Sequence, residues 1–256
     1  YSNSTFQTSR RYSARANTSF RPIERLTFDI HGDYLLQFSD QVGGALRTSQ
    51  VAWPDVNARW TDVQRLLGLN QTLSSMTINS WFTRKTQDTG RPDREPDQSD
   101  ETNSFNPLLG WDLMFRSGIH LTAASGLDKT RSSDQRAANF FRDRTSKTTR
   151  LALNKNFPAS KGIKFPFSKK RVRLPSDLNL GVQADLGADR SVVHQPPFQD
   201  TVEEDRTRLN VGSTSNYNFS QSISGGFNLA YRQTTDKKLR LTQRGITISF
   251  TGTFRF

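Results

Sequence analysis

The chain has 256 residues, of which only 33% are hydrophobic, and its mean hydropathy is -0.71. A membrane-spanning helix needs roughly 20 consecutive apolar residues, and no stretch of this sequence approaches that, so helical spans are excluded. Cys is absent, which excludes disulfides, a thiol nucleophile and cysteine-type zinc sites. The net charge of +12 raises nucleic acid as a partner, but most basic residues are scattered rather than clustered, so we predict that it binds none.

Alternation of apolar and polar residues, the main sequence signal for a strand with one buried face, recurs along the whole chain. It appears first at residues 12–20 and then at 26–38, where Phe28 and Leu36 share one side with other apolar residues. The second segment is long enough to cross a bilayer, because a tilted spanning strand needs roughly 9 to 11 residues. The same pattern returns at 75–82, 109–115, 119–127, 149–157 and 178–186.

The last three segments, 209–219, 223–231 and 246–256, show the pattern most clearly. In the last one, five apolar residues alternate with polar ones: Ile246, Ile248, Phe250, Phe254 and Phe256. A C-terminal strand of this kind is typical of bacterial outer-membrane β-barrels, in which alternate residues face lipid and lumen. A polar lumen and long loops also explain the low hydropathy. The sequence therefore predicts an all-β fold, an antiparallel up-and-down transmembrane barrel sheet of about ten strands, integral to the outer membrane.

The connections predict an orientation, because outer-membrane barrels have short periplasmic turns and longer extracellular loops. With Phe256 at the periplasmic rim, the polar segments 84–104, 132–146, 188–204 and 233–241 face outside. Residues 1–39 are predicted to be barrel strands. Residues 40–72 are predicted to be a periplasmic or plug-like connection with a short strand, and residues 73–256 to be barrel strands ending in the closing strand. Residues 158–175 are likewise expected to be a periplasmic element or short non-spanning strands.

Three blocks in the same order carry a resemblance to a known family: PDVNARWT (54–61), FNPLLGWD (105–112) and LPSDLNL (174–180). They resemble the C-terminal region of the SprA/Sov family, the giant outer-membrane translocon of the type IX secretion system. The resemblance covers residues 51–256 and departs at Asp62, where the family usually has Gly.

What the resemblance implies is a protein-conducting pore of about 36 strands, of which this chain would form the C-terminal part. Its partners would be secreted client proteins, a small barrel shuttle that collects them, and a periplasmic plug subunit. From the residues themselves we predict no enzymatic activity and no cofactor, and from the strand pattern outer-membrane lipid around the barrel.

Alternation assigns side chains to the two faces of the predicted sheet. The predicted lipid-facing residues are Phe28, Leu36, Leu178, Leu180, Phe227, Leu229, Ile248 and Phe250. The predicted lumen-facing residues are Asp177, Asn179, Gln183, Asp185, Arg206 and Arg208, a set that would suit any hydrated lumen. Phe254 and Phe256 are the predicted C-terminal assembly signal.

Other chemistry was weighed at three places. His194 beside Asp200 would suit a surface protease, although its Pro-containing surroundings indicate an ordinary loop. Acidic residues within 93–101 offer oxygen ligands for calcium, but their spacing lacks a known pattern, so no metal site is predicted. Basic residues within 161–173 could meet anionic headgroups, a periplasmic partner or solvent.

Two classes of function therefore stay open from the sequence. One is a transport conduit completed by upstream sequence. The other is a self-contained small barrel acting as surface enzyme, adhesin or channel, with a soluble β-sandwich binding module as a weaker third possibility. Because an open sheet edge in lipid leaves backbone groups unpaired, ten strands must either close on themselves or continue.

Overall fold

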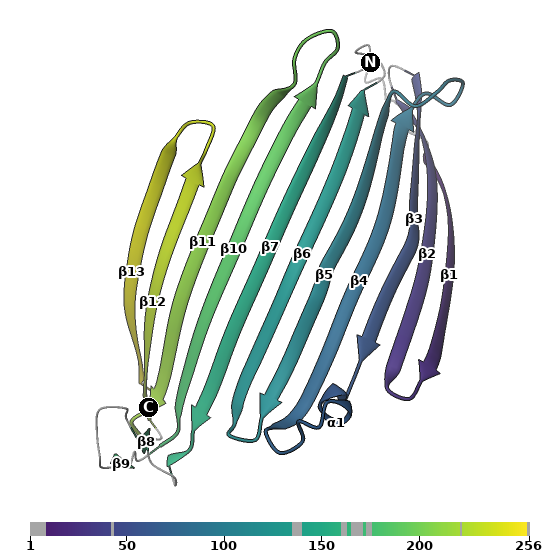
Figure 1. The fold of residues 1–256 in the computed structure, drawn as a ribbon. Helices are drawn as coiled ribbons and strands as arrows, with labels where there is room; N and C mark the ends of the chain where they lie inside the picture. The colour runs from purple at the N-terminus through teal and green to yellow at the C-terminus, as the bar shows by residue number, and fades with distance from the viewer. Residues whose placement is uncertain are drawn as a thin grey trace, which may run out of the picture.

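One antiparallel sheet of eleven strands makes up almost the whole molecule (Figure 1). The computed structural model describes residues 9–41, 44–134, 140–159, 163–164, 171–172, 176–220 and 222–254. The strands of the sheet are β1 (Ser9–Ile23), β2 (Leu26–Gln41), β3 (Gly44–Trp60), β4 (Leu73–Gly90), β5 (Gln98–Phe115), β6 (Ile119–Asp134), β7 (Phe140–Phe157), β10 (Leu178–His194), β11 (Thr201–Asn218), β12 (Ile223–Asp236) and β13 (Leu241–Phe254). Each strand pairs with its neighbours along the chain, which confirms the predicted all-β, up-and-down topology.

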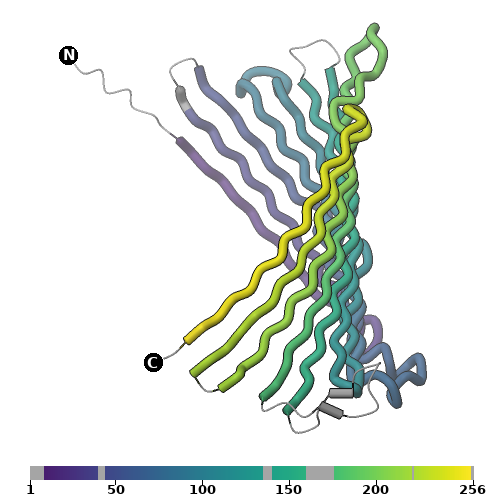
Figure 2. The backbone as a smooth tube through the Cα atoms, turned by 90° about the vertical axis from the view of Figure 1, so that its left-hand side faces the viewer, coloured from purple at the N-terminus to yellow at the C-terminus, as the bar shows by residue number. Residues whose placement is uncertain are grey.

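The two edges of the sheet are formed by β1 and β13. Among the described strands these two do not pair with each other, so the sheet is open rather than closed into a barrel. Figure 2 shows the strong twist of the sheet, and Figure 1 shows the two edge strands at its opposite sides. Because eleven strands alternate in direction, β1 and β13 run the same way (Figure 1).

The strands are 14 to 18 residues long, well beyond the predicted segments. They extend into polar stretches predicted to be loops, so that the connection from β4 to β5 is only residues 91–97. The prediction fails there because the outer halves of these strands are polar on both faces, and alternation is then absent.

The segment 40–72 differs most from its prediction, because most of it is β3, a 17-residue strand paired on both sides. A bulge between Ala52 and Asp55 breaks its alternation, and Pro54 within it is a poor strand residue. Trp53, in the bulge, lies over Gly32 of β2, since a Cβ built at Gly32 would be 2.9 Å from its ring. The bulge and Pro54 explain why the residue pattern did not predict this strand.

The remainder of 40–72 forms a compact connection around α1 (Val63–Leu66) at the lower end of the sheet in Figure 1. Val63, Gln64 and Leu73 are buried there. The amide N of Met76 donates to Gln64 Oε1 at 2.8 Å, and Gln64 Nε2 donates to the carbonyl of Ser74 at 3.3 Å. Gln64 therefore satisfies backbone groups at the start of β4.

Asp62, at the position where the resembling family usually has Gly, has φ 55° and ψ 31°. This left-handed conformation favours Gly and is tolerated by Asp and Asn better than by other residues. The Asp62 carboxylate also lies 3.6 Å from Arg25 Nε across the connection. Asp62 thus adopts a backbone conformation that a glycine would also favour.

The other long lower connection, 158–175, contains β8 (Ile163–Lys164) and β9 (Arg171–Val172), which pair with each other as a separate two-stranded sheet. Several of its basic residues, among them Lys161, Lys169, Lys170 and Arg173, lie outside the described residues.

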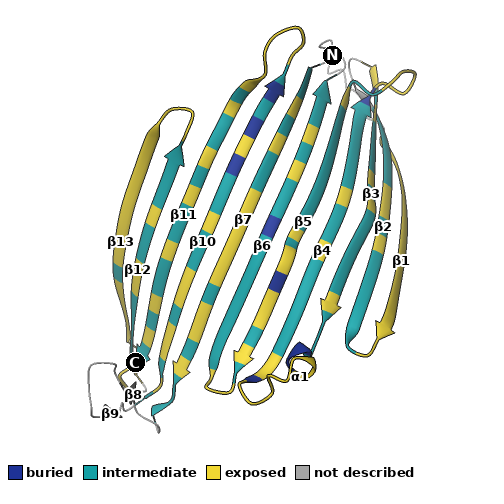
Figure 3. Cartoon of the chain, viewed as in Figure 1, coloured by how far each residue is buried: buried dark blue, intermediate teal, exposed yellow. Residues whose placement is uncertain are grey.

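The sheet is a single layer, and Figure 3 shows it almost entirely in the intermediate and exposed colours. Its accessible surface is 18429 Å², against about 11,400 Å² for a compact protein of this mass. Within the described residues, no helix has the length and apolar character needed to cross a bilayer. An isolated layer of this kind has no core of its own, which argues against the β-sandwich alternative.

Candidate functional site

The register of the strands divides the side chains into two faces, because paired residues of neighbouring strands point to the same side. Phe227 pairs with Phe250 and with Ser215, and Ser215 pairs with Leu180. The same pairing can be followed from strand to strand as far as β2. The bulges on the way do not change which side the paired residues face, so Phe28 and Leu36 lie on the same side as Phe227. All eight residues predicted to face lipid therefore share one side, called the apolar face below.

The lower half of the apolar face is a continuous belt, and most of its large side chains are exposed although they are hydrophobic. It includes Phe20, Phe28, Ile30, Leu36, Val56, Ile78, Phe82, Trp111, Leu121, Leu151, Leu153, Leu180, Val182, Leu186, Val211, Phe227, Leu229, Ile246, Ile248 and Phe250. Phe250 is 78% exposed and Ile246 is 69% exposed. Such a large exposed apolar area marks a surface that another apolar phase or partner covers.

Aromatic residues border this belt below and above. Near the lower strand ends the apolar face carries Trp60, Phe115, Phe157, Tyr217 and Phe254. Higher on the same face, Phe82 and Phe105 contact each other at a ring-centroid distance of 4.6 Å, and Tyr231 lies on β12. From Phe105 to Phe115, β5 has the height of about eight regular residues, because it bulges between Phe105 and Leu109; at ~3.3 Å per residue and ~45° tilt this gives ~19 Å. That height is of the same order as the apolar band of an outer-membrane barrel, about 25 Å tall between aromatic girdles.

The end of the chain is described as far as Phe254, which is exposed at the edge of the sheet opposite Ile223 of β12. Phe256, the other residue of the predicted assembly signal, lies outside the described residues.

The opposite side, called the polar face, holds the predicted lumen residues. Asn179, Gln183 and Asp185 of β10 lie on it with Arg206 and Arg208 of β11. Asp177 precedes β10 and accepts a hydrogen bond from the amide of Ala159 at 2.9 Å, so it is a residue of the lower connection.

Several charges on the polar face are paired across strands. Asp185 accepts hydrogen bonds from Arg150 Nε at 2.8 Å and from Gln183 Nε2 at 2.7 Å. The buried carboxylate of Asp189 pairs with Arg208 and accepts a hydrogen bond from Ser146. Arg206 donates to Asp236 at 3.1 Å. Several charges of this wall are thus neutralised by a partner, whereas others, such as Lys85 and Arg232, have no ion pair among the described residues. Such a polar wall stays hydrated.

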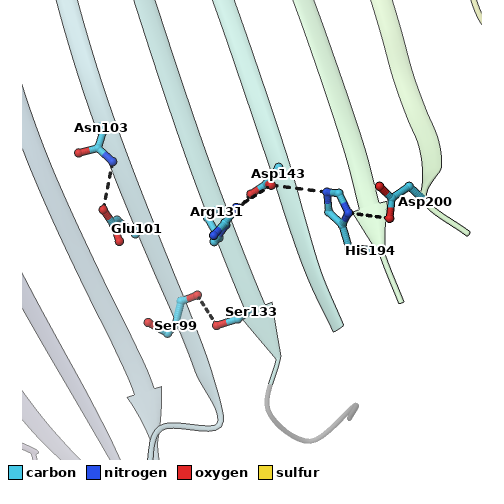
Figure 4. Close-up of polar contacts among 8 residues, drawn as sticks. All are labelled: Ser99, Glu101, Asn103, Arg131, Ser133, Asp143, His194 and Asp200. Carbon is cyan, nitrogen blue, oxygen red and sulfur yellow. Dashed lines mark hydrogen bonds and ion pairs between the residues drawn. The ribbon is translucent and has the colours of Figure 1, made fainter. Parts of the chain in front are cut away.

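Above the belt, the apolar face becomes polar and carries a row of ion pairs that the sequence did not predict, called the outer charge row below (Figure 4). Arg84 lies 3.1 Å from Glu101 across β4 and β5. Arg131 of β6 makes two hydrogen bonds to Asp143, directly opposite on β7, at 2.8 and 2.9 Å. The two hydrogen bonds and charge of Arg131, with the charge of His194, hold the pKa of Asp143 below its usual value against the effect of burial.

His194 does come together with Asp200, as the protease hypothesis required, with 2.7 Å between Nδ1 and Oδ1. Its Nε2 lies 3.5 Å from Asp143, and its ring stacks on Phe141 at a centroid distance of 4.3 Å. Both ring nitrogens thus face carboxylates. The arrangement fits a histidine that fastens the 195–200 loop to the sheet.

No group of three or more potential metal ligands of the His, Cys, Asp or Glu type occurs within the described part of the chain. The acidic segment 93–101 instead contributes Glu101 to the outer charge row and Asp100 to a contact with Gln98.

Comparison with known proteins assigns no family. No family model matches the chain, and no curated protein matches it. Among solved structures, it is similar to one described as a CymD monoaromatic hydrocarbon channel, with 13% sequence identity over 98% of this chain and 86% of that one. The TM-score is 0.18, so this similarity carries no conclusion about function.

Proposed function

We propose that the sheet is part of the wall of a bacterial outer-membrane β-barrel that conducts solutes through a hydrated lumen. The observation that supports this is that the sheet has two different faces. One carries an exposed apolar belt between aromatic rows, and the other is polar. In a bilayer the belt would contact lipid and the polar face would line the conduit.

The open edges support a larger barrel than these eleven strands. In lipid the unpaired backbone groups of β1 and β13 would each need a partner strand. Because β1 and β13 run in the same direction, antiparallel closure requires further strands between them. Single-chain bacterial barrels accordingly have an even number of strands.

The specific function that we propose for this conduit is protein export, which the resemblance to the SprA/Sov translocon implies. A wide barrel and a polar wall with several paired charges suit a pore that must not retain its cargo. The second candidate is a small-barrel channel. The same faces support it equally, but its barrel would also need strands beyond these eleven, because β1 and β13 run in the same direction. In neither candidate does the barrel wall act as an enzyme.

Blocking the lumen tests the conduit and separates the two candidates. These 256 residues contain no Cys, so Asn228→Cys on the polar face and Leu229→Cys on the apolar face can be compared in the full protein, freed of any other reactive Cys, in its own outer membrane. A bulky maleimide should react at Asn228→Cys and reduce transport. Loss of protein export would support the translocon, and loss of small-solute uptake alone would support the channel. Undiminished transport of both after full labelling would contradict a conduit.

A further inference from the structure

Three cations of the apolar face lie just above the belt around Thr145 of β7. Lys129 of β6 and Arg190 of β10 are the two direct neighbours of Thr145 across the strands. Lys147 follows Thr145 on the same face, two residues along. At strand spacings of about 4.8 Å, the Cα atoms of Lys129 and Arg190 are about 10 Å apart, within reach of one small anion held between the long side chains.

These three side chains are exposed and have no ion-pair partner among the described residues. The nearby carboxylates are engaged elsewhere. Asp143 is bound by Arg131, and Asp205, opposite Arg190, lies 3.7 Å from Lys237. The outer charge row therefore neutralises itself and leaves Lys129, Lys147 and Arg190 as a surplus of positive charge.

Two of the three cations line separate hollows. One of about 400 Å³ is polar and is lined by Lys129, Arg131 and Thr145 together with the carboxylates of Glu101 and Asp143. The other, about 310 Å³, is lined by Lys147 together with apolar residues at the upper limit of the belt, including Leu186 and Leu209. The cluster thus has polar space on one side and apolar space on the other.

We propose that Lys129, Lys147 and Arg190 bind the phosphate groups of a phosphorylated glycolipid in the outer leaflet. This inference rests on the proposed barrel placement, because only then do the cations stand at the headgroup level of that leaflet. Its phosphates meet the surplus charge, and its acyl chains continue over the belt. A soluble anion would use the cations but has no need of the apolar hollow beneath them.

The test uses the full purified protein and vesicles of phosphatidylcholine containing lipid A, with dephosphorylated lipid A as the comparison. The variant Lys129→Gln/Lys147→Gln/Arg190→Gln removes the cluster. The matched control Arg59→Gln/Lys85→Gln/Arg232→Gln removes three polar-face charges that have no ion pair among the described residues and line neither hollow. At about 1 kcal/mol per basic residue near a charged membrane surface, the cluster variant should lose on the order of 100-fold in affinity for lipid A vesicles. The control variant should keep its affinity.

Equal binding by the two variants, or equal binding to dephosphorylated lipid A, would overturn the proposal. Displacement of lipid A by inorganic phosphate alone would also overturn it, in favour of a soluble anion. Single-Cys labelling at Asn228 and Leu229 in the same preparations tests the membrane placement of the sheet independently of the glycolipid site. If the faces label as expected while lipid A binding is unchanged, only the glycolipid site is wrong.

Discussion

Phe227 and Phe250 lie directly opposite each other on β12 and β13, with ring centroids 5.1 Å apart on the apolar face. Ser249, the next residue along β13, pairs with Asn228 on the polar face. One residue step thus separates a surface expected in lipid from one expected in water.

Charge substitutions at these two neighbours should have very different costs. We expect Phe250→Lys to lower the free energy of unfolding by roughly 2 to 4 kcal/mol, because the ammonium group would enter the hydrocarbon region, and Ser249→Lys to cost little. Urea unfolding of the protein inserted in lipid vesicles measures both. Equal tolerance at the two sites would defeat the assignment of faces.

The lower connection should depend on the buried Gln64. In Gln64→Leu the amide of Met76 and the carbonyl of Ser74 would lose their partner, so we expect a loss of about 1 to 3 kcal/mol in unfolding free energy. Gln243→Leu, at an exposed position of β13, is the control and should change stability by less than about 0.5 kcal/mol. Denaturant midpoints in detergent compare them, and a neutral Gln64→Leu would show that these hydrogen bonds do not stabilise the connection.

The left-handed conformation at Asp62 gives a second test of that region. Asp62→Gly should be within about 1 kcal/mol of the parent, since Gly adopts positive φ freely, which offsets the loss of the Arg25 pairing and of the hydrogen bond from Gln64. Asp62→Val should cost about 1 to 2 kcal/mol, because a β-branched residue is strained there. Thermal unfolding of the two variants distinguishes them, and identical melting temperatures would argue against the turn.

Acid should weaken the outer charge row. The pKa of Asp143 is lowered from its usual value of 3.8, chiefly by its hydrogen bonds from Arg131. A depressed pKa means that the folded state gains stability above the usual value and loses it as the pH falls below about 3.8. Asp143→Asn should therefore flatten the acid side of the stability profile, whereas Asp93→Asn, at an exposed loop position, should not. An unchanged profile in Asp143→Asn would contradict this contribution.

Alternation predicted the lower half of the sheet because one face there is apolar and the other polar, as in β2, β10, β12 and β13. It could not predict the outer halves, since both faces are polar above the belt. Arg131 and Asp143 are far enough apart in sequence that only the register of β6 and β7 reveals their pairing. The bulge beside Pro54 hid β3 for a different reason, because it shifts the alternation by one residue within a strand.

The central claim is that the sheet spans a membrane with one face in lipid and the other in water. Measuring lipid and water exposure along β10 tests it most directly. Single Cys residues at 179, 180, 182 and 183 of the full protein in outer membranes would be reacted with a water-soluble maleimide and, separately, with a probe quenched by lipid-borne quenchers. The account predicts that Asn179→Cys and Gln183→Cys react with the maleimide, while Leu180→Cys and Val182→Cys resist it and are quenched from lipid. Uniform reaction at all four positions would contradict a membrane-spanning wall.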